Sequence, residues 1–513
     1  MHRPHHHRFH EPSPVQPVPS FPGPVGAKLA PKIHPLEKAL LGVVAAHLVF
    51  LPWALGTMHV WSQGISFGLS VLSILIALQP RYYDGEYTEG KPFTLHTRPK
   101  LLRFPIFWIG LLLFVYILIQ ALNPAWEYAR NDKVWWLQGV SCIDWLPTGM
   151  RTPFDQASPW RSLMIYSSAW LTACAVWIGF TRRRCLHALF VVLVVNGVLF
   201  ALVGLAQKLT GADEMLWCIP ARSDYFFATI IYKNHAAAYL NLILMAAFGL
   251  ALWHSDRAAR QMSRSDPSFV ILLGALLLFT ADLFTNSRMG MVLGAAGLLL
   301  GLAAYGIRTL QHREMLGNPL PFLLTAAFLA AFLAIGLSRV DWSKISERYA
   351  ALWTDDKVTS IESRNVARQA TLEMFMDSPL TGWGAGSFRF YFPVYQQRYP
   401  KIMTGVPELI QGKAVQRRLS WQYAHNDFVQ GLAELGMLGG LLVAGICGFW
   451  IYSFSRIRRW VHPVGFSVVA VSALTAVHCW VDFQLHCPAN LVTLGFILTA
   501  GLSWIVLEER IRA

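Results

Sequence analysis

One short stretch carries residues suited to proton transfer beside a predicted membrane helix. His425, Asn426 and Asp427 belong to the stretch from Tyr423 to Gly436, which continues directly into an apolar run from Met437 to Phe449. Histidine is the side chain whose ordinary pKa lies nearest neutrality, so His425 suits general acid or base chemistry. The helical spacing of the following apolar residues places the trio at a helix N-terminus, where unpaired N–H groups favour anions.

The same trio also fits a purely structural role. Asn and Asp are preferred at the N-cap, so Asn426 or Asp427 is expected to cap the helix that follows. Such a short motif indicates chemistry only when other parts of the chain supply matching groups.

Basic residues stand at several other predicted helix ends. Arg288 lies in a tight turn between two apolar runs, where a charge is costly unless it has a partner or a task. An arginine that extends to the membrane surface is an equally good explanation. Further cations lie near or at the start of other predicted helices, and these are Arg222, Lys233, Arg364 and Arg368.

These groups together suit a lipid-linked diphosphate as ligand. Arginine forks match phosphate oxygens, and His425 could take a proton from an attacking hydroxyl. Asp482, which ends a later predicted helix, could orient or pair with a basic partner. The cations would stabilise the departing diphosphate, so no metal is needed, and no D-x-D-like carboxylate cluster is present.

Composition favours a membrane protein. The chain has 513 residues, of which 54% are hydrophobic and 14% charged. In a soluble protein the net charge of +14 would suggest nucleic acid, but here we interpret it as a topology signal and expect no nucleic-acid partner. The seven cysteines have neither C-x-x-C nor zinc spacing, so no metal site, cofactor or disulfide framework follows. Cys142 and Cys218 could pair in predicted external loops, although nothing requires it.

The fold expected is an all-α polytopic membrane protein. Apolar runs of roughly 20 residues predict about twelve transmembrane helices. We place them near 38–58, 62–79, 104–122, 162–180, 185–206, 234–253, 268–286, 290–307, 319–337, 432–453, 463–482 and 489–507.

Loop charge predicts the orientation and the domains. Arginine-rich loops such as Arg182-Arg183-Arg184 fall on one side if both termini are cytoplasmic. The expected parts are a disordered, His- and Pro-rich cytoplasmic tail (1–36), helices one to nine (37–337), a large extracytoplasmic loop domain between helices nine and ten (338–431), and helices ten to twelve with a short cytoplasmic tail (432–513). Within the loop, Ser363-Arg364 opens an amphipathic helix. The Gly-rich stretch 379–388 is either an anion cradle or a tight connection.

Several motifs together resemble the O-antigen ligase and O-antigen polymerase superfamily of bacterial membrane glycan transferases. They are Ser287-Arg288-Met289-Gly290, Ser363-Arg364 followed by Pro379-Leu380-x-Gly382-x-Gly384-x-Gly386-x-Phe388, His425-Asn426-Asp427-Phe428-x-Gln430-x-x-x-Glu434-x-Gly436, Tyr232-Lys233-Asn234-His235-Ala236, and Val481-Asp482-Phe483-x-Leu485-x-x-Pro488-Ala489. The likeness covers about residues 190–500. Met289 departs from the glycine that is usual there, and Lys233 replaces a common arginine.

The resemblance implies a reaction and a place for it. The donor would be a glycan on a polyprenyl diphosphate, and the acceptor a hydroxyl of a lipid, glycan or protein, in lipopolysaccharide or exopolysaccharide assembly. His425 would activate that hydroxyl, while Arg288, Lys233, Arg222 and Arg364 would hold the diphosphate. Supporting positions would be Asn426, Asp427, Glu434, Arg368 and Asp482. The site would face the periplasm of a bacterial inner membrane.

Two functions from other classes compete with this one. A glycan or lipid transporter would carry charges or broken helices at mid-membrane, whereas these groups cluster at one face. A non-catalytic partner in an exopolysaccharide assembly complex would need no proton-transfer group. Diphosphate release by the purified protein would separate the three possibilities.

Overall fold

The structure is a computed structural model. It describes residues 32–88, 91–221, 225–263, 266–311, 360–403, 408–410, 413–415 and 418–512, with a few isolated helical positions between 312 and 359. Residues 1–31 of the expected tail, most of the expected ninth helix and Arg222 lie outside the described residues.

Long apolar helices dominate the described chain and confirm an all-α polytopic membrane protein. Ten of them are long and apolar enough to cross a membrane. They are α1 (Pro35–Trp53), α2 (Val60–Leu78), α4 (Pro105–Leu122), α5 (Pro159–Gly179), α6 (Arg183–Leu209), α7 (Lys233–Gln261), α9 (Arg288–Gln311), α15 (Asp427–Ser455), α16 (Pro463–Val481) and α17 (Pro488–Arg512). A shorter apolar helix, α8 (Ser268–Phe284), accompanies them. Eleven of the predicted spans thus coincide with helices in the described chain, and the total of about twelve stays a prediction.

Local sequence explains where these helices begin. Proline occupies the first position of α1, α4, α5 and α16, where its missing N–H costs no hydrogen bond and its fixed φ suits a helix. The Ser158 hydroxyl caps α5 by accepting from the backbone N–H of Arg161 at 3.3 Å. The ring of His462 caps α16 in the same manner, through Val464 N–H at 3.2 Å.

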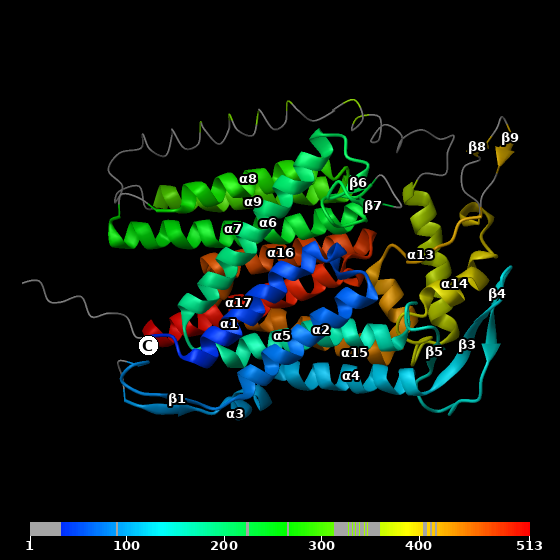
Figure 1. Ribbon diagram of the computed structural model, residues 1–513, viewed down its shortest axis with the longest axis horizontal. Helices are drawn as coiled ribbons and strands as arrows, with labels where there is room; N and C mark the ends of the chain where they lie inside the picture. Colours follow the sequence, from blue (N-terminus) through cyan, green and yellow to red (C-terminus); the bar gives the residue numbers. More distant parts are fainter. Residues whose placement is uncertain are drawn as a thin grey trace, which may run out of the picture.

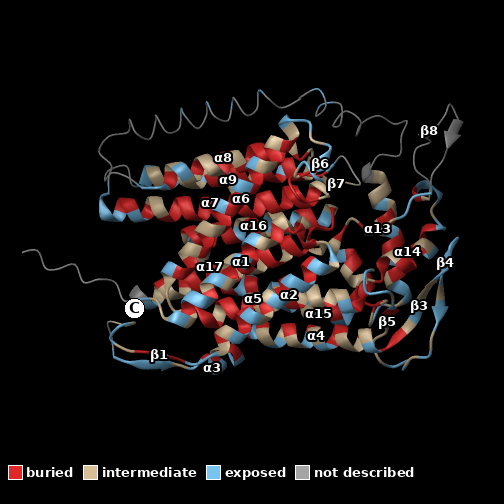
Figure 2. Cartoon of the chain, in the orientation of Figure 1, coloured by how far each residue is buried: buried red, intermediate tan, exposed pale blue. Residues whose placement is uncertain are grey.

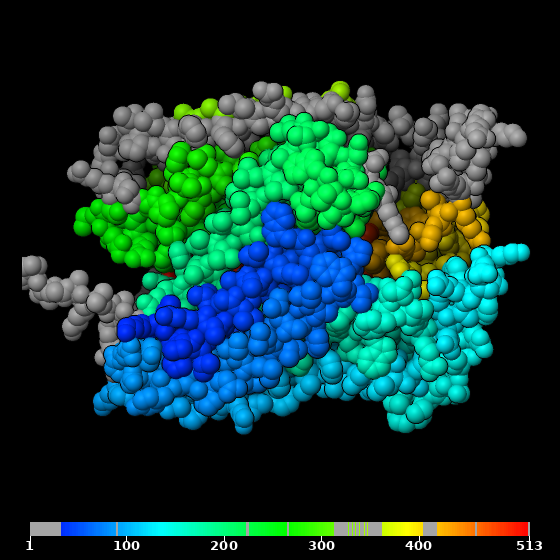
Figure 3. All heavy atoms as spheres, viewed as in Figure 1, coloured from blue at the N-terminus to red at the C-terminus, as the bar shows by residue number. Residues whose placement is uncertain are grey.

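Helix α7 lies at the centre of the bundle, and every residue from 234 to 253 is buried (Figure 2). It packs against α8, α9 and α16. Small residues allow this close approach: a Cβ on Gly290 of α9 would lie 2.3 Å from the Ala237 Cβ, and one on Gly249 would lie 2.4 Å from the Ser467 hydroxyl. On the face drawn in Figure 3, the blue α1–α2 segment packs side by side with α6, in green.

The two ends of the bundle carry different structures (Figure 1). One, here called the β1 end, holds the strand pair β1 (Arg81–Tyr83) and β2 (Phe93–Leu95), the short helix α3 (Thr97–Leu102) and the chain's C-terminus. The opposite, α13 end holds α13 (Ser360–Asp377), α14 (Phe388–Gln396) and a sheet of β3 (Pro124–Arg130), β4 (Trp135–Gly139) and β5 (Gly149–Arg151). Short elements complete the described chain: β6 (Glu214–Met215), β7 (Ile219–Pro220), β8 (Glu408–Ile410), β9 (Lys413–Val415) and the single turns η1 (Leu55–Thr57), η2 (Pro400–Ile402), η3 (Arg456–Val461) and η4 (Gln484–His486).

The α13 end has its own small apolar core. The sheet has the order β4-β3-β5, with β4 antiparallel and β5 parallel to β3. Buried side chains of α13 and α14 pack beneath it, including Met374 and Phe392. The amphipathic helix expected after Ser363 is therefore α13, and it lies across the ends of the membrane helices (Figure 1).

Candidate functional site

The start of α15 is built by Asn426. Its side-chain oxygen accepts from the backbone N–H groups of Phe428 and Val429 at 3.1 and 3.0 Å, which makes it the N-cap. Its amide nitrogen donates to the carbonyl of Trp480 at 2.8 Å and so ties α15 to the end of α16. The predicted helix N-terminus at the His-Asn-Asp trio is confirmed, with Asn426 as the cap.

His425, one residue before the cap, has an unusual backbone conformation. Its φ is +52°, a region that side chains other than glycine rarely occupy. Hydrogen bonds on both sides hold it there, because Asn426 is fixed as the cap and Ala424 N–H donates to the Gln430 side chain at 2.9 Å. Strain held by its surroundings is typical of functional residues.

This conformation brings His425 to Asp482. The Nδ1 atom lies 2.9 Å from Asp482 Oδ1, while the imidazole keeps 23% of its surface exposed and the carboxylate 1%. The ring of Phe483 lies edge-on to the imidazole, with centroids 5.0 Å apart. One ring nitrogen of His425 is thus held by Asp482, while part of the imidazole surface stays exposed and accessible to a substrate.

The surroundings of Asp482 favour the ionised form of its carboxyl. It accepts from Tyr232 at 3.2 Å, from the backbone N–H of Phe483 at 3.0 Å and from the Asn234 amide. Burial by itself would raise the pKa of this carboxyl, but the hydrogen bond and charge of His425 and the charge of Arg364 outweigh burial and hold its pKa well below the ordinary range.

The ionised carboxylate determines which nitrogen of His425 can act as a base. A carboxylate only accepts hydrogen bonds, so the shared proton must reside on Nδ1. In the neutral ring the other nitrogen, Nε2, then carries a lone pair. The arrangement orients a general base in the manner of a His–Asp pair.

Basic residues gather around this pair. Arg364, on α13, donates to the Val481 carbonyl at 3.0 Å and places a second nitrogen 4.0 Å from Asp482 Oδ2. Arg368, one turn further along α13, lies over the Trp480 ring at 5.7 Å from its centroid. These two cations therefore flank the end of α16.

Lys233 and Arg288 each begin a helix. The Lys233 ammonium lies over the ring of Tyr225, 4.3 Å from its centroid, one residue before the Asn234 that contacts Asp482. Arg288 follows a turn in which Asn286 has a φ of +58°. The contact of Gly290 with Ala237 lays the start of α9 beside the first turn of α7, so both cations stand at the α13 end.

A second His–Asp pair joins the same two segments of the chain as the first. Asp427 Oδ1 lies 2.7 Å from His486 Nδ1, and its other oxygen accepts from Leu485 N–H at 3.0 Å. Burial would lower the pKa of His486, but the hydrogen bond and charge of Asp427 outweigh it and raise the pKa. His486 was not among the predicted residues, because it occupies a variable position of the Val481–Ala489 motif.

Three more contributors were missed. Tyr232 and Asn234 lie inside a quoted motif, yet sequence alone offered no reason to direct them at Asp482. The ring of Phe483 stacks on Tyr232 at 5.1 Å and on Tyr423 at 4.1 Å. The ring of Phe483 thus packs near the histidines of both His–Asp pairs.

Glu434 anchors the Gly-rich stretch. Its carboxylate accepts from Gly386 N–H at 2.9 Å and Phe388 N–H at 3.3 Å, and its carbonyl accepts from Gly384 N–H at 2.8 Å. These donors are therefore already engaged. Of the two interpretations offered for residues 379–388, the tight connection fits, and Glu434 acts by positioning this loop.

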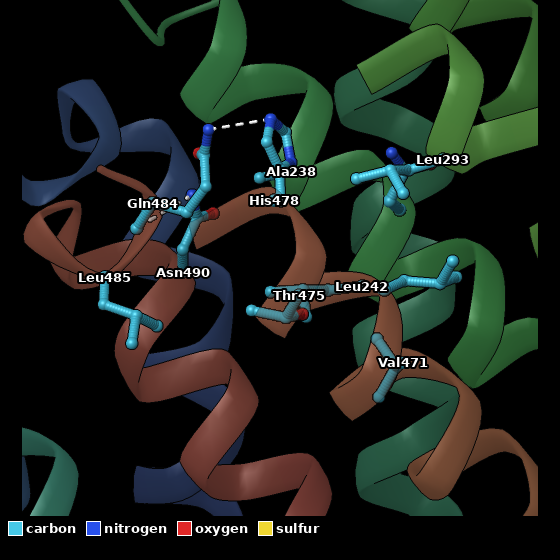
Figure 4. Close-up of a pocket in the computed structure, with 11 residues that line it drawn as sticks. Ala238, Leu242, Leu293, Val471, Thr475, His478, Gln484, Leu485 and Asn490 are labelled. Carbon is cyan, nitrogen blue, oxygen red and sulfur yellow. Dashed lines mark hydrogen bonds between the residues drawn. The ribbon is translucent and has the colours of Figure 1, made fainter. Parts of the chain in front are cut away.

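Buried polar side chains, among them His478, Gln484 and Asn490, line a small pocket between α7, α9, α16 and α17 (Figure 4). His478 and Gln484 share a hydrogen bond of 2.9 Å between their side-chain nitrogens, and Asn490 donates to the His235 carbonyl at 3.2 Å. The first contact joins α16 to η4, and the second joins α17 to α7. They hold in place the backbone that carries Asp482 and Phe483.

A metal site requires several clustered ligands, and a disulfide requires two adjacent cysteines. In the described ranges no group of three or more His, Cys, Asp or Glu side chains is arranged to hold a metal ion. Cys142 and Cys218 are both free thiols, so the pairing that the sequence permitted is not made in this structure.

The fold and the site define a multi-pass membrane protein with a polar site at one end of its helices. Comparison with known families matches residues 273–444 to the family described as O-antigen ligase, which is the family that the sequence motifs resemble. None of the curated proteins compared with the chain matches it. The resemblance noted in the sequence is confirmed over this segment, and the match supports glycan assembly of the O-antigen ligase or polymerase type.

Proposed function

We propose that this protein transfers a glycan from a polyprenyl-diphosphate carrier to an acceptor hydroxyl. The observation that carries the proposal is the hydrogen bond between His425 Nδ1 and buried Asp482 beside the guanidinium of Arg364. A base and a phosphate-binding cation at one point are what this transfer needs. The family match supports the reaction class.

The proposed step is a single displacement. Nε2 of His425 removes the proton of the acceptor hydroxyl, and the oxygen attacks the sugar carbon that bears the diphosphate. The bond from that carbon to the diphosphate oxygen breaks, and the lipid diphosphate leaves with the electron pair. Attack opposite the leaving group inverts the configuration at carbon.

Cations around the pair would hold the donor. Arg364, Lys233 and Arg288 stand at the α13 end, and charge-assisted hydrogen bonds to phosphate oxygens are among the stronger kinds. Arg222 is proposed for this role from the resemblance alone. Because these side chains stabilise the leaving diphosphate, transfer is proposed to be metal-independent and should persist in excess EDTA.

We further propose a location in a bacterial inner membrane, with the site facing the periplasm. Arg182, Arg183 and Arg184 begin α6, and the chain's C-terminus lies at the β1 end, opposite the site (Figure 1). Excess Lys and Arg marks the cytoplasmic side of membrane proteins. This supports cytoplasmic termini and an external active site.

The decisive test uses purified protein in lipid nanodiscs with a lipid-linked glycan donor. Release of the lipid diphosphate together with a new glycosidic product is expected from the wild type, and His425→Ala should abolish both. The exposed His96 provides a matched control, and His96→Ala should retain wild-type activity. Movement of the intact donor across the bilayer without cleavage would instead identify a transporter. Neither activity would identify a non-catalytic assembly partner.

A further inference from the structure

A large apolar cavity lies between helices that do not carry the cations proposed for the donor. It has a volume of about 320 Å³ and is enclosed by α4, α5, α15 and α17. Its long wall consists of side chains such as Leu113, Trp170 and Leu494. This volume lies within the range of small-molecule pockets, roughly 300–1,000 Å³.

One end of the cavity is polar. Asp427 and Glu434, from the first turns of α15, and His486, directly before α17, line it there. Trp450 and Leu498 lie further along the same helices and are apolar. The cavity is therefore amphipathic, with its polar end at the α13 end and its apolar part extending along the membrane helices.

The wall also reaches the outer surface of the bundle. Val443 lines the cavity and is 40% exposed, and Cys447, one turn along α15, is exposed as well. This surface belongs to a helix that is long and apolar enough to cross a membrane, so it is suited to face lipid. A hydrocarbon chain in the cavity would then adjoin the bilayer.

The charges of the polar end select the kind of headgroup. The lining includes two carboxylates and one imidazole but neither Lys nor Arg. Asp427 and Glu434 are already satisfied by His486 and by the Gly386 and Phe388 N–H groups, yet Glu434 still adds a negative charge. Such an environment repels phosphate and suits an uncharged, hydroxyl-bearing group.

This polar end adjoins the candidate base. Asp427 follows His425 by two residues, and the Phe483 ring lies 5.0 Å from the imidazole of His425 and 6.4 Å from that of His486. The ring of Phe483 therefore lies near both His425 and His486, and His486 lines the polar end. The cations for the donor lie on other helices, α7, α9 and α13.

We infer that this cavity binds the acceptor, a membrane amphiphile with a hydrocarbon chain and an uncharged, hydroxyl-bearing headgroup. Its assignment as acceptor rests on the proposed transfer function, whereas binding itself does not. The donor diphosphate, held by cations of α7, α9 and α13, and the acceptor, held between α4, α5, α15 and α17, would then meet at His425.

Glycine positions allow the cavity to be filled without disturbing the fold. Gly431 lines it, and a Cβ there would meet nothing within 4 Å, so Gly431→Leu should project into the space. On α17, Gly495→Leu does the same, with the nearest atom 3.9 Å from the new Cβ. Gly448→Leu is the matched control, since Gly448 lies on α15, is exposed and also has open space around it.

The experiment is photo-crosslinking of the full chain in nanodiscs. One probe is a neutral alkyl glycoside with a diazirine in its chain, and the other is the matching alkyl phosphate. The glycoside should label the cavity segments of α4 and α15, and Gly431→Leu and Gly495→Leu should reduce labelling about tenfold, equivalent to 1.4 kcal/mol. Gly448→Leu should not change it.

Two results would overturn the inference: equal labelling by the alkyl phosphate at the same segments, or labelling that the two filling variants leave unchanged. Transfer kinetics then test the acceptor role separately. Gly431→Leu should raise the KM for a glycolipid acceptor and leave the KM for the donor unchanged. Binding without any transfer would refute the proposed function while leaving the cavity's ligand class intact.

Discussion

His425 and Asp482 lie 57 residues apart in the chain, yet their side chains are 2.9 Å apart between Nδ1 and Oδ1. The pairing depends on the junction of α15 with α16, which the Asn426 amide closes on the Trp480 carbonyl. The same junction pairs Asp427 with His486. The two short segments 425–427 and 482–486 therefore each supply one histidine and one aspartate. The histidine of each segment pairs with the aspartate of the other.

The first prediction concerns Asp482. Asp482→Asn keeps the shape of the side chain but removes the charge that requires a proton on His425 Nδ1. Transfer should fall by roughly 10²–10⁴-fold, the range for general-base and triad aspartate substitutions. The measurement is the initial rate of product formation across pH, at matched protein levels.

The exposed Asp144 supplies the control, and Asp144→Asn should behave as wild type. A rate for Asp482→Asn within a few-fold of wild type, with an unchanged pH profile, would show that Asp482 does not orient the base.

The second prediction concerns donor binding by Arg364. Arg364→Ala removes a charged donor that lies beside the pair, so the KM for a diphosphate-linked donor should rise. Charged hydrogen bonds contribute roughly 1.5–3 kcal/mol, so an increase of about 10–100-fold is expected. Arg364→Lys should recover part of this, because lysine keeps the charge without the planar fork.

Arg398 is a suitable comparison, since it is 60% exposed and pairs with Glu373 on the same part of the molecule. Arg398→Ala should leave the donor KM unchanged. If both arginine variants raised it equally, the effect would be general electrostatics and not a contact at Arg364.

The third prediction is a pH dependence of stability from His486. Its pKa is raised in the folded protein by Asp427. The stabilisation is therefore complete below the ordinary histidine pKa of about 6.5 and is lost as the pH rises through the higher folded value. The thermal unfolding midpoint in detergent should fall between mildly acidic and alkaline pH, and His486→Gln should flatten this decline.

His96→Gln, at an exposed position, should retain the wild-type slope. Parallel curves for wild type and His486→Gln would mean that the pair titrates equally in the folded and unfolded states.

The fourth prediction concerns the contact between α15 and the Gly-rich stretch. Gly436 has φ +64° inside α15, and a Cβ there would lie 2.4 Å from the Leu380 carbonyl oxygen. Gly436→Ala should destabilise the protein by about 1–3 kcal/mol through backbone strain, with more from the clash.

Gly448→Ala provides a control of opposite sign. Gly448 is helical with open space around it, so alanine should stabilise the helix by about 0.5–1 kcal/mol. Unfolding midpoints of the two variants should therefore move in opposite directions, and a shared direction would contradict the strain argument.

Sequence alone predicted the helices well, because an apolar run of membrane length has few structural alternatives. The trio at the start of α15, the helix after Ser363 and the turn before Arg288 were predicted for the same local reasons. Motif resemblance also indicated the O-antigen ligase family, whose model matches residues 273–444.

The partnerships within the site were decided by tertiary structure. Hydrophobic periodicity describes each helix separately, and it contains no information on which carboxylate meets which imidazole across a helix junction. The pairing of Asp482 with His425, the pairing of His486 with Asp427, and the use of Glu434 to anchor a loop all depend on how α15, α16 and α17 pack. Local sequence thus determined the elements and the kinds of groups at their ends, whereas the close packing of distant segments determined which of those groups act together.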